Sequence, residues 1–189
     1  MITNGSKIYK IRVKYARSKN LTHSAACAVL REIVLNSGND VLRMDSNKAW
    51  PRITFGPVLE PAADSKCEFC DIYFPSPQNA EEVKKRLNAV SKEGFEFLEA
   101  KNIPFVFPSV ENLACAAEFV LEYDGKPEIS KENLISSEVI EVADGKKLKI
   151  IIPLNKSREV IDGFAKFEGA KIVKENLLWR GSDGVLTPL

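Results

Sequence analysis

The sequence predicts a mixed α+β fold built from two ferredoxin-like halves, each with the element order βαββαβ and with antiparallel sheets. Three features predict it: strict apolar–polar alternation near the N-terminus, apolar residues at helical spacing between predicted strands, and a return of the element order after residue 110. We expect the first half to span residues 1–102 and the second residues 110–189. The second half rests on element order alone, because the halves share no recognisable sequence repeat.

The first predicted strand, residues 7–16, alternates between two kinds of side chain. One face would carry the apolar set, Tyr9, Ile11, Val13 and Tyr15. The other would carry the mostly polar set, Lys10, Arg12, Lys14 and Ala16. This period of two is typical of a strand that is covered on one face. A helix follows, with Thr22 as its N-cap and a stop signal at residues 36–38.

The other elements are predicted from spacing, caps and turns. For the first half we expect a short strand at 41–44, an irregular connection at 45–66 with 53–55 extended, a strand at 68–74, a helix opened by a capping box of Asn79 and Glu82 and ended by Gly94, and a strand at 95–100. Residues 103–109 are expected to form an ordered, packed crossing. For the second half we expect a strand at 117–123, a helical turn at 130–134, a hairpin over 138–154 turning at Asp144 and Gly145, a helix capped by Ser157, and a strand at 172–179.

Composition excludes several classes of protein. Of 189 residues, 44% are hydrophobic and 28% charged, which is ordinary for a globular chain and argues against disorder. No apolar run approaches the ~20 residues that a membrane-spanning helix needs, so we expect no membrane partner. The start of the chain lacks the apolar stretch of a signal peptide, and we therefore expect a cytoplasmic location.

Charge is distributed unevenly along the chain. The net charge is +1, but residues 1–31 contain seven basic side chains and no carboxylate, and the first acidic residue is Glu32. A basic segment of this kind attracts polyanions such as RNA, although it is also typical of a solvated face. On the predicted open sheet face, Lys10, Arg12 and Lys14 would lie near Phe69 and Tyr73, as in modules that stack RNA bases. The alternative is that solvent or the other half covers this face.

A loop holds a second candidate, Trp50 with Arg52. A tryptophan beside a cation can stack a base or a ring, but it can equally pack one half against the other. His23 is the only histidine, and no nucleophile–base–orienter triad can be assembled. Cys67 and Cys70 have the spacing of metal ligands, but the second pair that a zinc site requires is absent. We therefore expect no catalytic centre, metal or cofactor, with one of these cysteines buried and the other half-exposed.

Three stretches together resemble a known family: Leu21–Ser24, Pro51–Leu59 and Glu68–Ile72. They are similar to the SHLD, GFNPHP, SFGPAL and EYLDI patterns of the uncharacterised radical SAM-linked proteins, which occur alone or fused behind a B12-type radical SAM domain. The matching positions are His23, Pro51, Arg52, Phe55, Gly56, Pro57, Leu59, Glu68 and Asp71. The chain departs from these patterns at Ala25, Lys48 and Trp50. The genes that accompany the family imply RNA-modification machinery.

The leading hypothesis is a non-catalytic RNA-binding or substrate-presenting accessory protein that serves a separate radical SAM enzyme. Its expected RNA- or partner-binding residues are Lys10, Arg12, Lys14, Arg17, Lys19, His23, Trp50 and Arg52. One alternative is a metal-independent endoribonuclease of the tandem ferredoxin-like type, with His23 and Arg52 in catalysis. Another is a protein-interaction module that binds no nucleic acid. The oligomeric state stays open.

Overall fold

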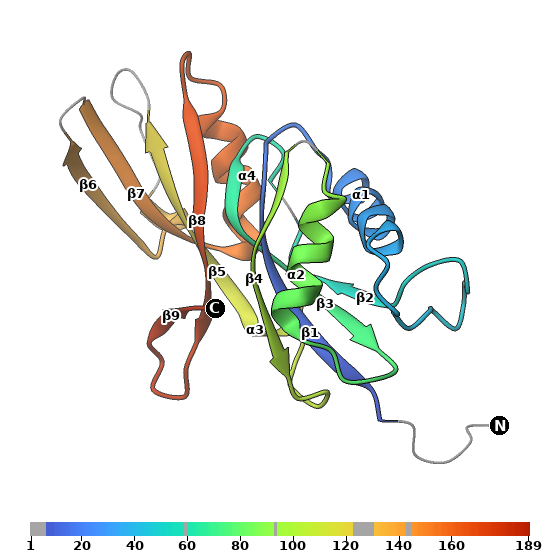
Figure 1. Ribbon diagram of the computed structural model, residues 1–189. Helices are drawn as coiled ribbons and strands as arrows, with labels where there is room; N and C mark the ends of the chain where they lie inside the picture. Colours follow the sequence, from blue (N-terminus) through green and yellow to red (C-terminus); the bar gives the residue numbers. More distant parts are fainter. Residues whose placement is uncertain (1–6, 59, 93, 123–130, 143–144) are drawn as a thin grey trace. The chain divides into compact units, whose positions relative to one another are not determined.

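The computed structural model describes residues 7–58, 60–92, 94–122, 131–142 and 145–189 (Figure 1). It confirms a mixed α+β protein in which most strand pairs are antiparallel. The described residues group into two compact units. The first comprises those within 1–16, 24–56 and 68–112, and the second those within 17–23, 57–67 and 113–189. Two short segments from the N-terminal part of the chain therefore belong to the second unit.

The first unit has a small sheet and two main helices. Its elements are β1 (Tyr9–Arg17), α1 (His23–Asn36), β2 (Ile53–Phe55), β3 (Asp64–Phe74), α2 (Ala80–Ala89), β4 (Phe95–Ile103) and α3 (Val110–Leu113). The last residue of β1, the first of α1, the first four of β3 and the last of α3 belong to the second unit. The strands are ordered β4–β1–β3, and β2 pairs antiparallel with β3. Figure 1 shows α1 and α2 beside these strands.

Local sequence patterns account for most of this unit. Ile11 and Val13 are fully buried, as the alternation of β1 predicts. The chain leaves α1 through Gly38, whose φ of 68° suits a residue without a Cβ. At the start of α2, the Asn79 side chain accepts a hydrogen bond from the Glu82 backbone N–H. This is one of the two bonds of the predicted capping box.

The second strand of this unit lies later in the chain than predicted. The expected strand at 41–44 is only an isolated bridge between Arg43 and Pro51, and the second strand is β2, which covers the residues 53–55 that the sequence predicts to be extended. The backbone turns back here, because Met44 N–H donates to Trp50 O and Arg52 N–H donates to Leu42 O. Pro51 fits this position because the bonds on either side of it come from the N–H groups of Met44 and Arg52, and neither requires an N–H on residue 51.

The second unit is built around a larger antiparallel ladder. Its elements are β5 (Ala114–Glu122), the 3-10 turn η1 (Lys131–Asn133), β6 (Ser136–Val142), β7 (Gly145–Pro153), α4 (Leu154–Phe164), β8 (Lys171–Arg180) and β9 (Leu186–Pro188). The strand order is β8–β5–β7–β6, with β9 on β8. Asp64 and Ser65, at the start of β3, pair in parallel with β8.

Two sequence predictions for the second unit need comment. Ser157 does not cap α4, because the helix begins at Leu154 and Pro153 holds the N-cap position. The serine lies inside the first turn of the helix, where it is buried and its hydroxyl donates to the Glu60 carboxylate. The predicted hairpin is present as β6 and β7, but its turn residue Asp144 lies outside the described residues.

Candidate nucleic-acid interface

Cations of β1 meet a buried carboxylate on β3. Asp71 is fully buried, and the Arg12 guanidinium binds both of its oxygens, with Nε–Oδ1 at 2.8 Å and Nη2–Oδ2 at 3.0 Å. Lys10 Nζ lies 3.7 Å from Asp71 Oδ2 and is itself buried. Burial lowers the pKa of Lys10, whereas the charge of Asp71 opposes the shift. Two residues of the predicted RNA-binding set thus form an internal ion cluster.

The segment after β4 crosses over this cluster, as an ordered crossing predicts. Lys10 Nζ donates to Phe107 O at 2.5 Å, and Arg12 Nη2 donates to Pro108 O at 2.7 Å. The Arg12 guanidinium also lies 5.7 Å from the Phe107 ring centroid. In the same segment, Phe105, Val106 and Phe107 keep 45%, 88% and 46% of their surface exposed.

Two cation–aromatic stacks lie at the edge of the same unit. Arg52 is 4.9 Å from the Tyr73 ring centroid and 6.0 Å from that of Phe105. The two rings meet edge to face at 6.1 Å. Arg31, on α1, lies 4.5 Å above the Trp50 ring, which is 44% exposed. We call these five residues the cation–aromatic surface.

Backbone pairing holds the two stacks near each other. The Tyr73 backbone N–H donates to Arg52 O, and β2 pairs directly beyond it, with Ile53 opposite Ile72. Phe55, at the end of β2, lies 4.9 Å from the Arg31 guanidinium, so one arginine contacts residues at both ends of the 50–55 segment. Cation–π contacts of this kind contribute about 0.5–1 kcal/mol each where they are exposed.

The other predicted residues lie in different surroundings. Lys14, half-buried on β1, lies 5.9 Å from the buried Phe69 ring. Arg17, Lys19 and His23 fall in the second unit. Arg17 is buried and donates to Glu60 O at 2.8 Å, and Lys19 is exposed. His23 is half-buried as the first residue of α1.

Sequence reasoning missed a buried polar cluster in the second unit. Lys174 Nζ lies 2.8 Å from Glu60 Oε2, and both side chains are 1% exposed. Ser157 Oγ donates to Glu60 Oε1 at 2.5 Å. Burial by itself raises the pKa of Glu60, but the charge of Lys174 and the two hydrogen bonds outweigh it and lower the pKa. Glu60 lies 97 residues before Ser157, and Ser157 and Lys174 belong to different elements, α4 and β8. No local sequence spacing therefore indicates the cluster.

The cysteine pair is more deeply buried than expected. Cys67 and Cys70 are 1% and 0% exposed, which corrects the prediction that one would be half-exposed. Burial raises the pKa of the Cys70 thiol. Within the described ranges, no group of three or more histidine, cysteine, aspartate or glutamate residues is arranged to hold a metal ion.

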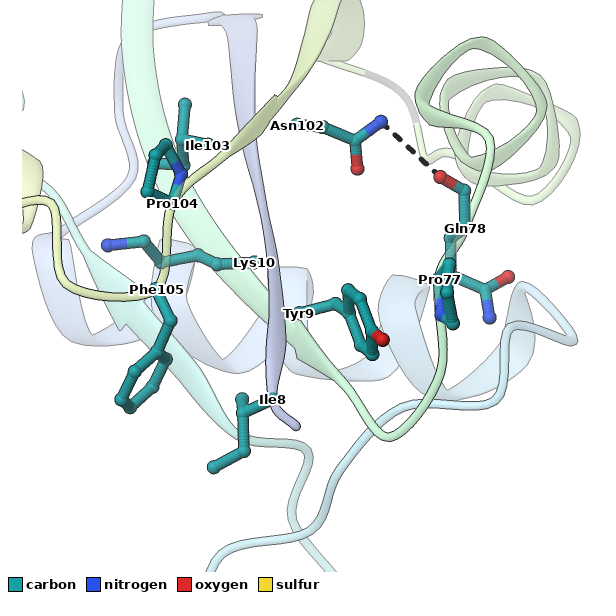
Figure 2. A pocket seen from close by; sticks show the side chains of 9 residues that line it. All are labelled: Ile8, Tyr9, Lys10, Pro77, Gln78, Asn102, Ile103, Pro104 and Phe105. Carbon is teal, nitrogen blue, oxygen red and sulfur yellow. Dashed lines mark hydrogen bonds between the residues drawn. The ribbon is translucent and has the colours of Figure 1, made fainter. Parts of the chain in front are cut away.

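A cavity of about 290 Å³ opens in the first unit, at the start of β1 and the end of β4 (Figure 2). Tyr9, Pro77 and Phe105 contribute to its walls. Asn102 also lines it and donates from its side-chain amide to Gln78 O at 3.3 Å. Phe105 therefore belongs both to the cavity and to the cation–aromatic surface.

Comparison with known proteins identifies the family. None of the helices among the described residues is long and apolar enough to cross a membrane. No curated protein matches the chain. The sequence model of one family, described as an uncharacterized protein conserved in bacteria (DUF2344), matches residues 48–188, which include Trp50, Arg52, Tyr73 and Phe105. The chain belongs to this conserved bacterial family.

Proposed function

We propose that this protein is a non-catalytic RNA-binding or substrate-presenting accessory protein and that the cation–aromatic surface binds single-stranded RNA. The observation that carries the proposal is the exposed Trp50 ring stacked on Arg31, two residues before an arginine packed on Tyr73 and Phe105. Proteins bind unpaired bases on exposed aromatic rings and hold the backbone with nearby cations. Here Trp50 and Phe105 expose 44% and 45% of their surface beside Arg31 and Arg52, whereas Tyr73 is buried and supports Arg52 from below.

The cations predicted from sequence contribute unequally to this proposal. Lys10 and Arg12 are paired with Asp71 and with backbone carbonyls, and Arg17 donates to Glu60 O. Reversing the charge of Lys10 or Arg12 would set an acid against a buried carboxylate and unfold the unit, so these substitutions do not test RNA binding. Arg31 and Arg52 are the better probes, together with Lys14 and Lys19 as secondary phosphate contacts.

The test is retention of labelled single-stranded RNA on a filter, at about 50 and about 200 mM salt. We expect retention that falls steeply between the two, because phosphate contacts release counterions. Trp50→Ala and Arg52→Ala should each weaken binding by about 1–3 kcal/mol, the contribution of a stacked base. Trp179→Ala is the control for the first, since Trp179 is also exposed but lies on β8 of the second unit. Arg158→Ala, on α4, is the control for the second.

Three results would contradict parts of the proposal. No retention at low salt would remove RNA binding and leave a protein partner as the function. Equal losses in Trp50→Ala and Trp179→Ala would remove the cation–aromatic surface as the site. Cleavage of the retained RNA that stops with His23→Ala would replace an accessory role with the endoribonuclease alternative.

The proposed partner is a separate radical SAM enzyme that modifies the presented RNA. The support is the resemblance at Pro51, Arg52 and Phe55–Pro57, which lie in or beside the cation–aromatic surface. We also propose that both halves are ferredoxin-like. The strand orders β4–β1–β3–β2 and β8–β5–β7–β6 support this, because each corresponds to 4-1-3-2 when the strands of a half are numbered in sequence. An experimental structure with another order in either half would contradict it.

A further inference from the structure

The cavity in Figure 2 has the size and walls of a site for one small planar group. Its volume of about 290 Å³ is at the lower limit of the ~300–1,000 Å³ typical of ligand sites. Four of the nine lining residues carry rings, namely Tyr9, Pro77, Pro104 and Phe105. Flat apolar walls favour a flat aromatic ligand over a flexible or highly charged one.

One side-chain amide gives the cavity a polar, directional group. Asn102 Nδ2 donates to Gln78 O. This bond orients the amide, so that its nitrogen faces the segment at residues 77–78. Figure 2 shows the Asn102 oxygen on the side of the open space, away from that bond. The cavity therefore presents a hydrogen-bond acceptor to a ligand. Lys10 also lines the cavity, but its Nζ donates to Phe107 O.

The cavity and the cation–aromatic surface share one residue, Phe105. Phe105 lines the cavity and also meets Tyr73 edge to face beside Arg52. An RNA strand that contacts Arg52 and Phe105 would thus lie at one wall of the cavity. Single-stranded recognition commonly turns one base out of the stack and reads its edge with an amide side chain.

We propose that this cavity binds one unstacked RNA base and favours a base with an exocyclic amino group, such as adenine or cytosine, over uracil. This inference rests on the function proposed above. The amino group donates to the Asn102 oxygen while the ring packs against the flat walls. Uracil offers only an imino N–H flanked by two carbonyl oxygens, which repel an acceptor oxygen. The cavity thus adds base preference to the sequence-independent binding of the cation–aromatic surface.

The test compares equal-length oligo(A), oligo(C) and oligo(U) by fluorescence anisotropy at one low salt concentration. We expect oligo(A) and oligo(C) to bind about three- to tenfold more tightly than oligo(U), the ratio that one neutral hydrogen bond provides. Asn102→Leu keeps the side-chain size but removes the acceptor, so it should bring the ratio close to one and leave oligo(U) affinity unchanged. Asn155→Leu, at an exposed asparagine on α4, should leave the ratio as in the parent.

The outcomes separate this inference from the proposed function. Equal affinities for all three oligonucleotides, or a ratio that survives Asn102→Leu, would overturn the base site while RNA binding stands. If no oligonucleotide binds, the proposed function fails, and adenosine and uridine monophosphates are then titrated by NMR. Shifts at the Tyr9 and Asn102 amides with the adenosine nucleotide alone would support the cavity as a base site. No shift with either nucleotide would overturn it.

Discussion

At the scale of single residues, two of the ion clusters in this protein are buried, whereas most of its other ion pairs lie on exposed side chains. Asp71 pairs with both Arg12 and Lys10 in the first unit, and Glu60 pairs with Lys174 in the second. Charges this deeply buried are stable only when they are paired and hydrogen-bonded, because each has lost its hydration. The basic N-terminal segment therefore leaves less charge for an anionic ligand than its composition suggests, and the RNA binding proposed above relies on Arg31 and Arg52 instead.

Glu60 should make the stability of the protein depend on acid pH. Its pKa is lowered in the folded protein from an ordinary value of 4.5, so the folded state binds the proton less readily than the unfolded chain. The corresponding stabilisation is complete above pH 4.5 and is lost as the pH falls through the folded pKa. Glu60→Gln should flatten this part of the pH dependence. It should also cost about 3–5 kcal/mol at neutral pH, because Lys174 keeps its charge without a carboxylate.

Urea unfolding at neutral pH and at several values below the ordinary pKa of Glu60 measures both effects. Glu159→Gln is the control, because Glu159 is exposed on α4 and its change should leave the acid dependence as in the parent. A Glu60→Gln variant whose free energy of unfolding falls as steeply with acid as that of the parent would contradict this role.

At the scale of elements, the pairing of β2 with β3 depends on a glycine. A Cβ at Gly56 would lie 3.0 Å from the backbone oxygen of Phe69, to which Gly56 N–H donates. The Phe69 backbone would have to shift by a few tenths of an ångström within a hydrogen-bonded ladder, so Gly56→Ala should cost about 1–3 kcal/mol. Gly163→Ala is the matched control, since a Cβ there meets nothing within 4 Å and the residue lies in α4.

The control substitution should have the opposite sign. Alanine in place of a helical glycine stabilises by about 0.5–1 kcal/mol. Thermal unfolding followed by circular dichroism would show a lower midpoint for Gly56→Ala and a higher one for Gly163→Ala. Equal midpoints for the two variants would mean that the β2 segment adjusts and that the close approach at Phe69 is not structurally required.

The elements that the sequence predicts are those specified by neighbouring residues. The alternation in β1, the turn at Gly38 and the Asn79 cap each involve groups a few residues apart, and each is present. The errors have long-range causes. Ser157 fits an N-cap pattern, but Glu60, 97 residues away, binds its hydroxyl, and the helix begins three residues earlier. The strand expected at 41–44 is replaced by one that is positioned by pairing with β3.

In the candidate site as well, the sequence indicates residues that are close in the chain but not their distant partners. Trp50 and Arg52 could be proposed from one loop, because a tryptophan near cations is visible in sequence. Their partners could not, since Arg31 lies on α1 and Phe105 follows β4. The sequence also predicts Lys10 and Arg12 on one face of β1, but it cannot show that Asp71 and a crossing segment occupy them.

At the scale of the whole molecule, the two units interleave along the chain. The predicted division into 1–102 and 110–189 assigns residues 57–67 to the first half, whereas their contacts are with the second unit. In that segment, Glu60 binds Lys174 and Ser157, and Asp64 and Ser65 pair in parallel with β8. The unit that contains residues 113–189 is therefore incomplete without a stretch that lies about fifty residues earlier.

A fragment of residues 110–189 should consequently fail to fold by itself. It lacks Glu60, so Lys174 would be buried with no carboxylate, and it lacks the strand residues that pair with β8. We expect this fragment to show no cooperative thermal transition and poorly dispersed amide resonances, in contrast to the full chain. If the fragment unfolds as cooperatively as the full chain, residues 57–67 are dispensable and the division near residue 110 marks two independent domains.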